Sequence, residues 1–471
     1  MFSHVHKSLA AISRRSIVKG SIALAGVSAL GLATRSVHSQ TAPRVRMDIA
    51  TFAQDAGRLS RFEAAMKQMQ DASARNPNDP AGWLANANMH RDFCAMPGGA
   101  NDPAQIHFCW WFLAWHRAYL SVTERKIRQI SGDDSFSYPY WNWSTDRRIP
   151  AAYAKHGSPL ANAVRFTPNR GLNDGEVGLL HDDPAIEQLG VAALAATFFE
   201  ATTADDIPAS FGGIARPNAE DAFDNNALEG TPHGPVHVYV GGQTRRGVGD
   251  MTDFATAGRD PIFFAHHGNL DRLWETWRRD PARKATEPTS DAFQNHAFVF
   301  KWLDGTDVQV PMSDILDTTK LGYTYDTLEV NRPQAIVMAE QAAPEPLPPI
   351  ATQKLAVPLA QQGADDGSRR YLEITGVAKP DTPLSVSVVV KPAGAPASER
   401  GIEVGTFAAV LNGGKIDWPS GRLVFDITNA ARKFGGQEVT VELIPHRIGP
   451  DADQSFPPLK YDKMNIVTKR R

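Results

Sequence analysis

The sequence predicts a mainly α-helical domain, a helical bundle around a paired histidine site, followed by a smaller all-β domain. Three observations predict this order. Apolar residues recur at helical spacing before residue 280, and most histidines and tryptophans gather in the same regions. After residue 351, β-branched runs alternate with Gly, Pro and Asn. The length of 471 residues also favours more than one domain.

The first 40 residues have the features of a targeting segment. The stretch from Ser13 to Lys19 resembles a twin-arginine export motif, and the apolar run from Gly20 to Ala33 is too short to span a membrane. We therefore expect residues 1–40 to be a twin-arginine signal peptide that directs the chain to the periplasm or out of the cell. The alternative is a chance Arg-Arg pair before a buried helix.

Residues 41–335 form the expected helical domain. Apolar residues at helical spacing predict helices over residues 59–70 and 112–130. A third helix is expected over residues 260–279, because Asp260 is a typical N-cap and Pro261 suits the first helical position.

The composition changes after this domain. Residues 336–351 are rich in proline and predict a semi-rigid linker. Residues 352–471 predict a small sandwich or barrel. The strands expected in it are Tyr371–Val377, Leu384–Val390, Thr406–Leu411, Arg422–Ile427 and Glu438–Ile444.

Charge and cysteine content exclude some classes of protein. The formal net charge is -3 and no basic block stands out, so we expect no nucleic-acid surface. We also expect no membrane span, since no apolar run is long enough. Two cysteines, Cys94 and Cys109, do not make a disulfide framework.

Six of the 14 histidines form two triplets that suit metal binding. His233 and His237 are four residues apart, so they lie on one face of a helical turn, and His267 follows on the helix expected at 260–279. In the other triplet, His107 and His116 are nine residues apart and would point to opposite sides of one helix. Both can face one metal only if His107 lies in the loop before the helix. The third member of that triplet is His90.

The segments that carry these histidines resemble the two copper signatures of the tyrosinase and catechol oxidase (polyphenol oxidase) family. The first is His107-Phe108-Cys109-Trp110-Trp111-Phe112-Leu113-Ala114-Trp115-His116-Arg117, with Glu124 after it. The second runs from Asp260 to Trp274, and Tyr138-Pro139-Tyr140-Trp141-Asn142-Trp143 between them is also similar to a family segment. The resemblance covers roughly residues 44–330 and implies a type-3 dinuclear copper protein with a plant-type C-terminal domain.

The resemblance implies a ligand set for two copper ions. His90, His107 and His116 would hold copper A. His233, His237 and His267 would hold copper B, which leaves His266 as a neighbour rather than a ligand. An all-imidazole donor set also favours copper over dinuclear iron or catalytic zinc, which use carboxylates or thiolates. Asp271 either orients the His267 ring or pairs with an arginine.

The resemblance also implies roles for residues beside the metals. Cys94 would form a thioether to His107, the alternatives being a buried thiol or a disulfide to Cys109. Glu229 would take a proton from the phenol directly or through a water, unless it only interacts with a helix dipole. Phe254 would stack over copper A as a gate, unless it is only a core aromatic.

Gly234 stands where members that hydroxylate monophenols often carry Asn, so its lack of a side chain favours diphenol oxidation. The expected function is therefore copper-dependent oxidation of o-diphenols to o-quinones with dioxygen, with weaker ortho-hydroxylation of monophenols. The alternatives are a true tyrosinase and a haemocyanin-like oxygen carrier. A phenolic substrate, dioxygen and a copper-loading protein are the expected partners.

Two further expectations concern the C-terminal half of the chain. The resemblance implies that a paired tyrosine motif, Tyr323-Thr324-Tyr325, contacts Arg44 or Arg46. It also implies that the β-rich segment covers the site and keeps some members latent, the alternative being a purely stabilising role.

Overall fold

The computed structural model describes most of the chain after residue 42. Residues 43–471 form one compact unit. The described ranges are 43–94, 105–145, 149–165, 193–203, 207, 209–215, 226–244, 247–329, 348–357, 368–396, 401–418, 422–434, 437–446 and 456–470. Within these ranges no helix is both long and apolar enough to cross a membrane. The expected leader (1–40) and most of the expected linker (336–351) lie outside the described residues.

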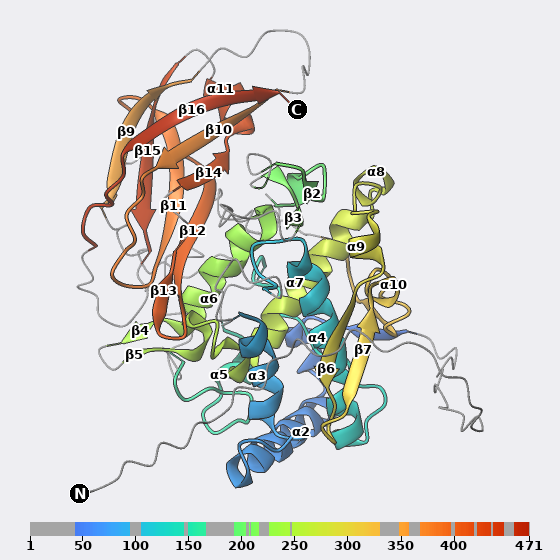
Figure 1. The fold of residues 1–471 in the computed structure, drawn as a ribbon. Helices are drawn as coiled ribbons and strands as arrows, with labels where there is room; N and C mark the ends of the chain where they lie inside the picture. Colours follow the sequence, from blue (N-terminus) through green and yellow to red (C-terminus); the bar gives the residue numbers. More distant parts are fainter. Residues whose placement is uncertain are drawn as a thin grey trace, which may run out of the picture. The chain divides into compact units, whose positions relative to one another are not determined.

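The first part of the unit is mainly helical (Figure 1). Its longer helices are α2 (Ala56–Arg75), α3 (Trp83–Cys94), α4 (Trp111–Ser131), α6 (Gly234–Gly241) and α7 (Ile262–Arg278). One turn of π-helix, η6 (Glu229–His233), leads directly into α6. The short elements are α1 (Ile49–Phe52), α5 (Ala151–Ala154), α8 (Pro281–Lys284), α9 (Asp291–Gln294), α10 (Met312–Ile315), η4 (Ala193–Ala195), η7 (Asp250–Thr252) and η8 (Ala257–Arg259).

The three predicted helices are confirmed as α2, α4 and α7, each with shifted ends. Helix α7 begins at Ile262, two residues after the predicted N-cap, although the Asp260 carboxylate still accepts the Ile262 N–H at 3.1 Å. Asp260 also forms a buried ion pair with Arg165. Helix α4 is buried on almost every side, as expected for a helix at the centre of a bundle.

The helical part also contains short two-stranded ribbons. They are β1 (Arg44–Arg46) with β8 (Tyr323–Tyr325), β2 (Glu200–Ala201) with β3 (Gly213–Ile214), β4 (Gln243–Thr244) with β5 (Gly247–Val248), and β6 (Ala297–Lys301) with β7 (Asp307–Pro311). In the first ribbon the Arg46 guanidinium lies 3.5 Å from the centre of the Tyr323 ring. The predicted contact between an N-terminal arginine and the tyrosine pair is therefore confirmed, and Arg46 is buried there.

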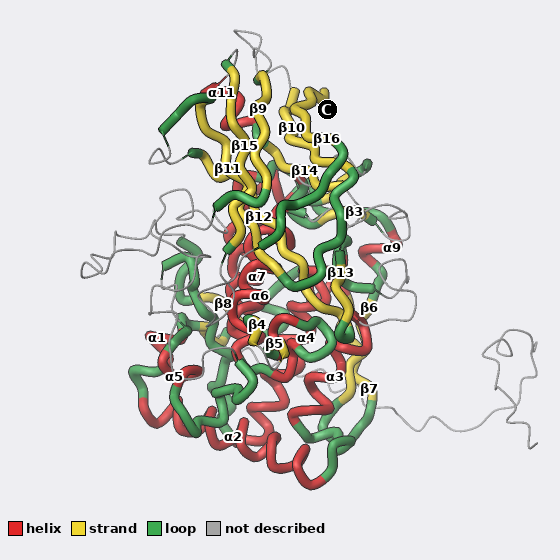
Figure 2. Tube along the Cα trace, turned by 90° about the vertical axis from the view of Figure 1, so that its left-hand side faces the viewer, coloured by secondary structure: helices red, strands yellow, loops and turns green. Residues whose placement is uncertain are grey.

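The last part of the unit contains two antiparallel sheets (Figure 2). One has the strand order β13-β12-β11-β15-β9 and the other β14-β10-β16. Their bounds are β9 (Ala351–Ala356), β10 (Ser368–Thr375), β11 (Leu384–Pro392), β12 (Ile402–Asn412), β13 (Lys415–Asp417), β14 (Arg422–Asp426), β15 (Glu438–Pro445) and β16 (Lys463–Arg470), with helix α11 (Thr428–Phe434) after β14. All five predicted strands are present, and the fold class predicted from the sequence is confirmed.

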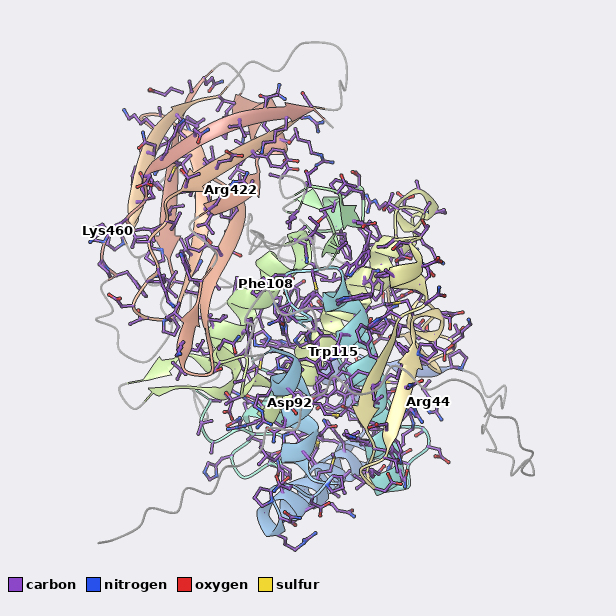
Figure 3. The ribbon with its side chains drawn as sticks, in the orientation of Figure 1. Arg44, Asp92, Phe108, Trp115, Arg422 and Lys460 are labelled. Carbon is purple, nitrogen blue, oxygen red and sulfur yellow. The ribbon has the colours of Figure 1, made fainter. Side chains whose placement is uncertain are left out.

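Two large hydrophobic clusters match the two parts. The first gathers apolar residues of α2, α3, α4, α6 and α7, and the second gathers those of both sheets. Figure 3 labels Phe108 and Trp115 in the helical part and Arg422 and Lys460 in the β-rich part. Val410 of β12 is an exception, because it is buried within the first cluster although its strand belongs to the sheets.

Candidate metal centre

The first histidine triplet joins two helices and the loop between them. His90 lies on α3, His116 lies on α4, and His107 precedes α4, as the spacing predicted. One nitrogen of each ring lies within 4.8 Å of the others, and all three rings are buried. Nδ1 of His90 lies 3.0 Å from the Phe254 carbonyl and Nδ1 of His116 lies 2.7 Å from the Phe112 carbonyl. Since a carbonyl only accepts, these rings carry their proton on Nδ1 and present a lone pair on Nε2.

The second triplet is built from the π-turn and two helices. His233 ends η6, His237 lies one turn further on α6, and His267 lies on α7. Nδ1 of His237 donates to the Met251 carbonyl at 2.8 Å, which again leaves Nε2 as the free lone pair. That Nε2 lies 3.5 Å from Nε2 of His267. These nitrogens therefore face a common point.

His266 lies in the same cluster but has a different partner. The indole N–H of Trp143 donates to its Nδ1 at 3.1 Å. An imidazole that accepts at Nδ1 carries its proton on Nε2 when neutral, so it has no lone pair left for a metal. This geometry supports the expectation that His267, rather than His266, is the ligand.

The two triplets face each other. The rings of His116 and His267 are stacked, with centroids 4.0 Å apart and planes 4° from parallel. The rings of His107 and His233 lie 5.7 Å apart at 24°. Two metal ions held by these triplets would therefore be neighbours in one buried site.

Burial keeps five of the six imidazoles neutral. It lowers the pKa of His116 to about 3 and that of His237 to about 4, and the His237 charge contributes to the shift of His116. The pKa values of His90, His233 and His267 also fall well below 6.5, mainly through burial and then through neighbouring histidines. A neutral ring is the form that binds a metal.

The donor chemistry of the clusters fits copper. Nε2 of His116 and Nε2 of His233 are buried without a hydrogen-bond partner among the described residues. Leaving such an atom unsatisfied costs about 1–3 kcal/mol, which coordination to a metal would offset. The two described clusters contain imidazoles without carboxylates or thiolates, a donor set typical of copper rather than of catalytic zinc or dinuclear iron.

Glu229 has partners that the sequence did not predict. Its two carboxylate oxygens accept the Phe108 N–H at 2.8 and 3.0 Å, and the Asn226 amide donates to it at 3.0 Å. Phe108 follows His107 and has φ 59°, the only positive φ at a non-glycine residue in the described part of the chain. The carboxylate thus stabilises the unusual backbone beside a candidate ligand.

Phe254 and Gly234 each lie next to a candidate ligand. The Phe254 ring stacks on His107 with centroids 4.6 Å apart and planes 12° from parallel, and its role as a gate over copper A stays a prediction. A Cβ added at Gly234 would lie 3.5 Å from Cβ of Ala408 on β12, which is ordinary van der Waals contact. The β-rich part therefore contacts the residue that follows His233.

Cys94 lies beside the first triplet. Its Sγ is 3.2 Å from Nε2 of His90, at the end of α3, and it is fully buried. The Sγ of Cys109 lies elsewhere, 3.5 Å from the Gln105 carbonyl. The expected thioether from Cys94 to His107 stays a prediction.

Asp271 pairs with arginines rather than with His267. Its carboxylate accepts from Arg117 and, at 3.1 Å, from Arg46, and it also accepts from both tyrosine hydroxyls of β8. Burial alone would raise the pKa of Asp271, but the two guanidinium groups hold it below its ordinary value. Of the two roles left open by the sequence, arginine pairing is the one present, in the core rather than on the surface.

Sequence reasoning missed the groups that orient the rings. The carbonyls of Phe112, Met251 and Phe254 accept the Nδ1 protons, and every residue type offers such a carbonyl. Gln105 was also missed, although its side chain accepts the His107 N–H at 3.1 Å. The sequence indicated a role for Trp143 only weakly, because this residue belongs to the aromatic segment between the two histidine regions.

The fold and the two facing clusters define a helical-bundle protein suited to a dinuclear copper centre. Residues 80–280 match a family model described as the common central domain of tyrosinase. The chain is 31% identical over 291 residues to polyphenol oxidase E from Solanum lycopersicum, covering 60% of this chain and 49% of that one. It is 30% identical over 291 residues to catechol oxidase B from Solanum tuberosum, with the same two coverages.

The likeness of fold extends to the β-rich part. The structure of latent apple tyrosinase matches with a TM-score of 0.66 and 23% identity, covering 91% of this chain and 97% of that chain. Residues 80–280 therefore resemble the central domain common to tyrosinases. It spans about half the length of the curated relatives it matches.

The expected localisation is wrong. Polyphenol oxidase E and catechol oxidase B are both named as chloroplastic, which contradicts the expected twin-arginine export into the periplasm or out of the cell. The physical reason is that the two kinds of targeting segment share a composition. Residues 1–40 contain five Lys or Arg, many serines and no acidic residue, which is also typical of transit peptides.

Proposed function

We propose that the chain is a copper-dependent polyphenol oxidase that oxidises o-diphenols to o-quinones with dioxygen. In this proposal His90, His107 and His116 hold copper A. Copper B is held by His233, His237 and His267. The observation that carries the proposal is the pair of buried triplets whose rings stack at 4.0 Å between His116 and His267.

When bound, a dinuclear copper centre supplies dioxygen binding and accepts two electrons from the phenolic ring. The residues of the chain orient the histidine rings and exclude water. The carbonyls that hold Nδ1 of His90, His116 and His237 fix each ring with Nε2 toward the centre. The stacked ring of Phe254 covers His107 and excludes water on that side.

Glu229 is the proposed proton acceptor for the phenol, directly or through a water. Its buried carboxylate supports this role, and the same carboxylate holds Phe108. Gly234 supports a preference for diphenols, because it offers no side chain to orient a water. Monophenol hydroxylation is proposed as the weaker activity.

The experiment is a direct assay of copper-loaded protein. We expect two coppers per chain by elemental analysis, and quinone absorbance when catechol is added in air. Initial rates with dopa should exceed those with tyrosine. Equal rates on the two substrates would contradict the diphenol preference and favour a true tyrosinase.

A haemocyanin-like oxygen carrier is the second candidate, since it would share the two triplets. It predicts reversible oxygen binding without turnover of catechol. A stable oxygenated spectrum in the presence of catechol would support the carrier and contradict the oxidase.

The thioether between Cys94 and His107 is part of the same proposal. Burial of the Cys94 sulfur beside the first triplet supports it, and such a bond would fix a ligand that lies in a loop rather than on a helix. Forming this bond breaks the S–H bond of Cys94 and one ring C–H bond of His107, with dioxygen as the two-electron oxidant. We therefore expect the intact mass to be two hydrogens lighter after copper loading in air. We also expect a linked peptide that survives reduction. Separate peptides after reduction would contradict the bond.

A further inference from the structure

A hairpin of the β-rich part reaches the first triplet. Strands β12 and β13 are joined by Gly413 and Gly414, whose φ values are 61° and 78°. A Cβ on either glycine would meet nothing within 4 Å, so glycine is needed for the backbone conformation and not for space. Both glycine N–H groups donate to one carboxylate, that of Asp253, at 2.9 and 2.8 Å.

The residues before the glycines add two more contacts with the helical part. The Leu411 carbonyl accepts the Phe254 N–H at 2.9 Å. The Asn412 side-chain amide donates to the Cys94 carbonyl at 2.9 Å. Residues 411–414, called here the docking turn, thus bind Cys94, Asp253 and Phe254 by hydrogen bonds.

The first of these contacts continues to His90. The Phe254 peptide donates its N–H to the docking turn, and its carbonyl accepts Nδ1 of His90 at 3.0 Å. One residue therefore lies between the turn and this ring. A shift of the turn would move the carbonyl that sets the direction of the ring.

The second contact continues to His107. The Cys94 carbonyl, which accepts from Asn412, also accepts the Gln105 amide at 3.0 Å. The Oε1 atom of Gln105 accepts the N–H groups of Ile106 and His107 at 2.9 and 3.1 Å. The turn therefore reaches the loop that carries His107 through two residues.

Within the described part of the chain, the hydrogen bonds that orient the second triplet do not pass through the turn. Nδ1 of His237 is held by the Met251 carbonyl, and His233 and His267 lie on η6 and α7. His116, in the first triplet, is held within its own helix by the Phe112 carbonyl. The support given by the turn is thus directed at two ligands of copper A.

Ordinary packing does not account for these polar contacts. The apolar residues Ala408 and Val410 of β12 already pack on the helical part. Asp253 is 8% exposed, and a carboxylate that is so buried is costly unless it is hydrogen-bonded. Its partners are the two turn N–H groups and the Ala255 N–H at 2.8 Å.

We propose that the docking turn is a structural part of the copper A site, with Asp253 and Asn412 as positioning residues. The inference rests on the proposed dicopper centre. It assigns to the β-rich part a role in retaining copper A, distinct from covering the site.

The experiment compares copper retention in full-length chains. Asp253→Asn keeps the Oδ1 contacts to Ala255 and Gly413 but turns an amide donor toward the Gly414 N–H. Asn412→Ala removes the contact to Cys94 from the other side of the interface. Asp250→Asn is the matched control, since Asp250 lies in the same loop and binds Asn162 at 2.8 Å instead of the turn.

Each loaded protein is dialysed against a graded copper chelator, and copper per chain is measured by elemental analysis. We expect Asp253→Asn and Asn412→Ala to lose one copper at about tenfold lower chelator strength than wild type, as for other residues that orient ligands. The remaining Cu(II), no longer coupled to a second ion, should give an electron paramagnetic resonance signal. The control should retain both ions as wild type does.

Two outcomes would overturn the inference alone. One is that both variants retain two coppers at the wild-type chelator strength. The other is that they lose both ions together. A wild-type chain that binds no copper would contradict the proposed function itself and the inference with it. Thermal unfolding of the apo chains shows whether each variant is folded before loading.

Discussion

Two adjacent histidines, His266 and His267, differ in whether a ring nitrogen is available to bind a metal. The Trp143 N–H occupies Nδ1 of His266, whereas Nε2 of His267 faces that of His237. We predict that His267→Gln lowers copper to about one per chain, because one ligand in a set of three is lost. His266→Gln should retain two, since its amide oxygen can still accept from Trp143.

Elemental analysis of the two loaded variants checks this prediction, and apo melting curves serve as the control. Both rings are fully buried, so a similar loss of stability is expected in each variant. Loss of copper in His266→Gln with retention in His267→Gln would reverse the assignment.

Glu229 and Phe108 form a second pair whose interaction is testable. A left-handed conformation costs a non-glycine residue about 1–2 kcal/mol, and the Glu229 carboxylate stabilises it through the Phe108 N–H. We predict that Glu229→Ala lowers the free energy of unfolding by about 1–3 kcal/mol, because it removes a charged acceptor of the buried Phe108 N–H. Phe108→Gly keeps this N–H and adopts positive φ without strain, so Glu229→Ala should cost about the same in the Phe108→Gly background as in wild type.

Urea unfolding of the four apo chains measures the cost of Glu229→Ala in both backgrounds. No cost in either background would mean that Glu229 does not stabilise the backbone at position 108. The role of Glu229 as a proton acceptor is a separate matter, tested by the rate with catechol in a Glu229→Gln chain that still holds two coppers.

The sequence predicted the side chains of this site better than the atoms that orient them. Spacing placed His107 in a loop and His267 on an inward face, because both follow from helix geometry. The carbonyls of Phe254 and Met251 carry no side-chain signal, so no pattern indicates them. The pairing of Asp271 with Arg46 was not predicted either, because the two residues are 225 positions apart in the sequence.

At the scale of elements, periodicity predicted α2, α4 and α7 because each buries one continuous face or more. It did not predict the π-turn η6, in which Pro232 precedes His233. A π-turn depends on an extra residue within a helical turn, and sequence periodicity over five residues does not indicate it. Strands β9, β13 and β16 were also missed, since edge strands and short hairpin arms have weak alternation.

The contact between α3 and α4 includes a buried lysine whose charge opposes folding. Lys126 on α4 is 1% exposed, and its Nζ donates to Asn86 on α3 at 3.0 Å. Burial lowers its pKa from 10.5 to about 8. The folded chain therefore binds fewer protons than the unfolded chain between about pH 8 and 10.5, and stability rises with pH across that window.

We predict that Lys126→Met stabilises the chain at pH 7 by roughly 1–2 kcal/mol, after allowance for the lost hydrogen bond. The gain should shrink toward pH 10, where the folded wild-type chain already holds a neutral lysine. Urea unfolding at pH 7 and pH 10 checks this. Lys67→Met, at a position 63% exposed and paired with Asp71, is the control and should change little at either pH. A gain that is the same at both pH values would contradict the role of charge.

At the scale of the whole molecule, the order of a helical part and a β-rich part followed from composition and periodicity. The contacts between the parts did not. The Asp253 carboxylate binds N–H groups 160 and 161 residues further along the chain, and no local pattern indicates such a pair. The compartment was also beyond the sequence pattern, because one basic, acid-free composition serves more than one destination.

The interface between the two parts leads to a prediction about a chain cut between them. Val410 of β12 is 4% exposed within the core of the helical part, and the docking turn adds hydrogen bonds beside it. We predict that a chain with a specific protease site inserted in the expected linker, residues 336–351, remains one species on gel filtration after cleavage. In the cut chain, Val410→Asp should separate the two pieces, because an unpaired buried charge costs several kcal/mol. The uncut chain with the same insertion is the control. Separation of the cut wild-type pieces without denaturant would mean that the linker, rather than β12, holds the parts together.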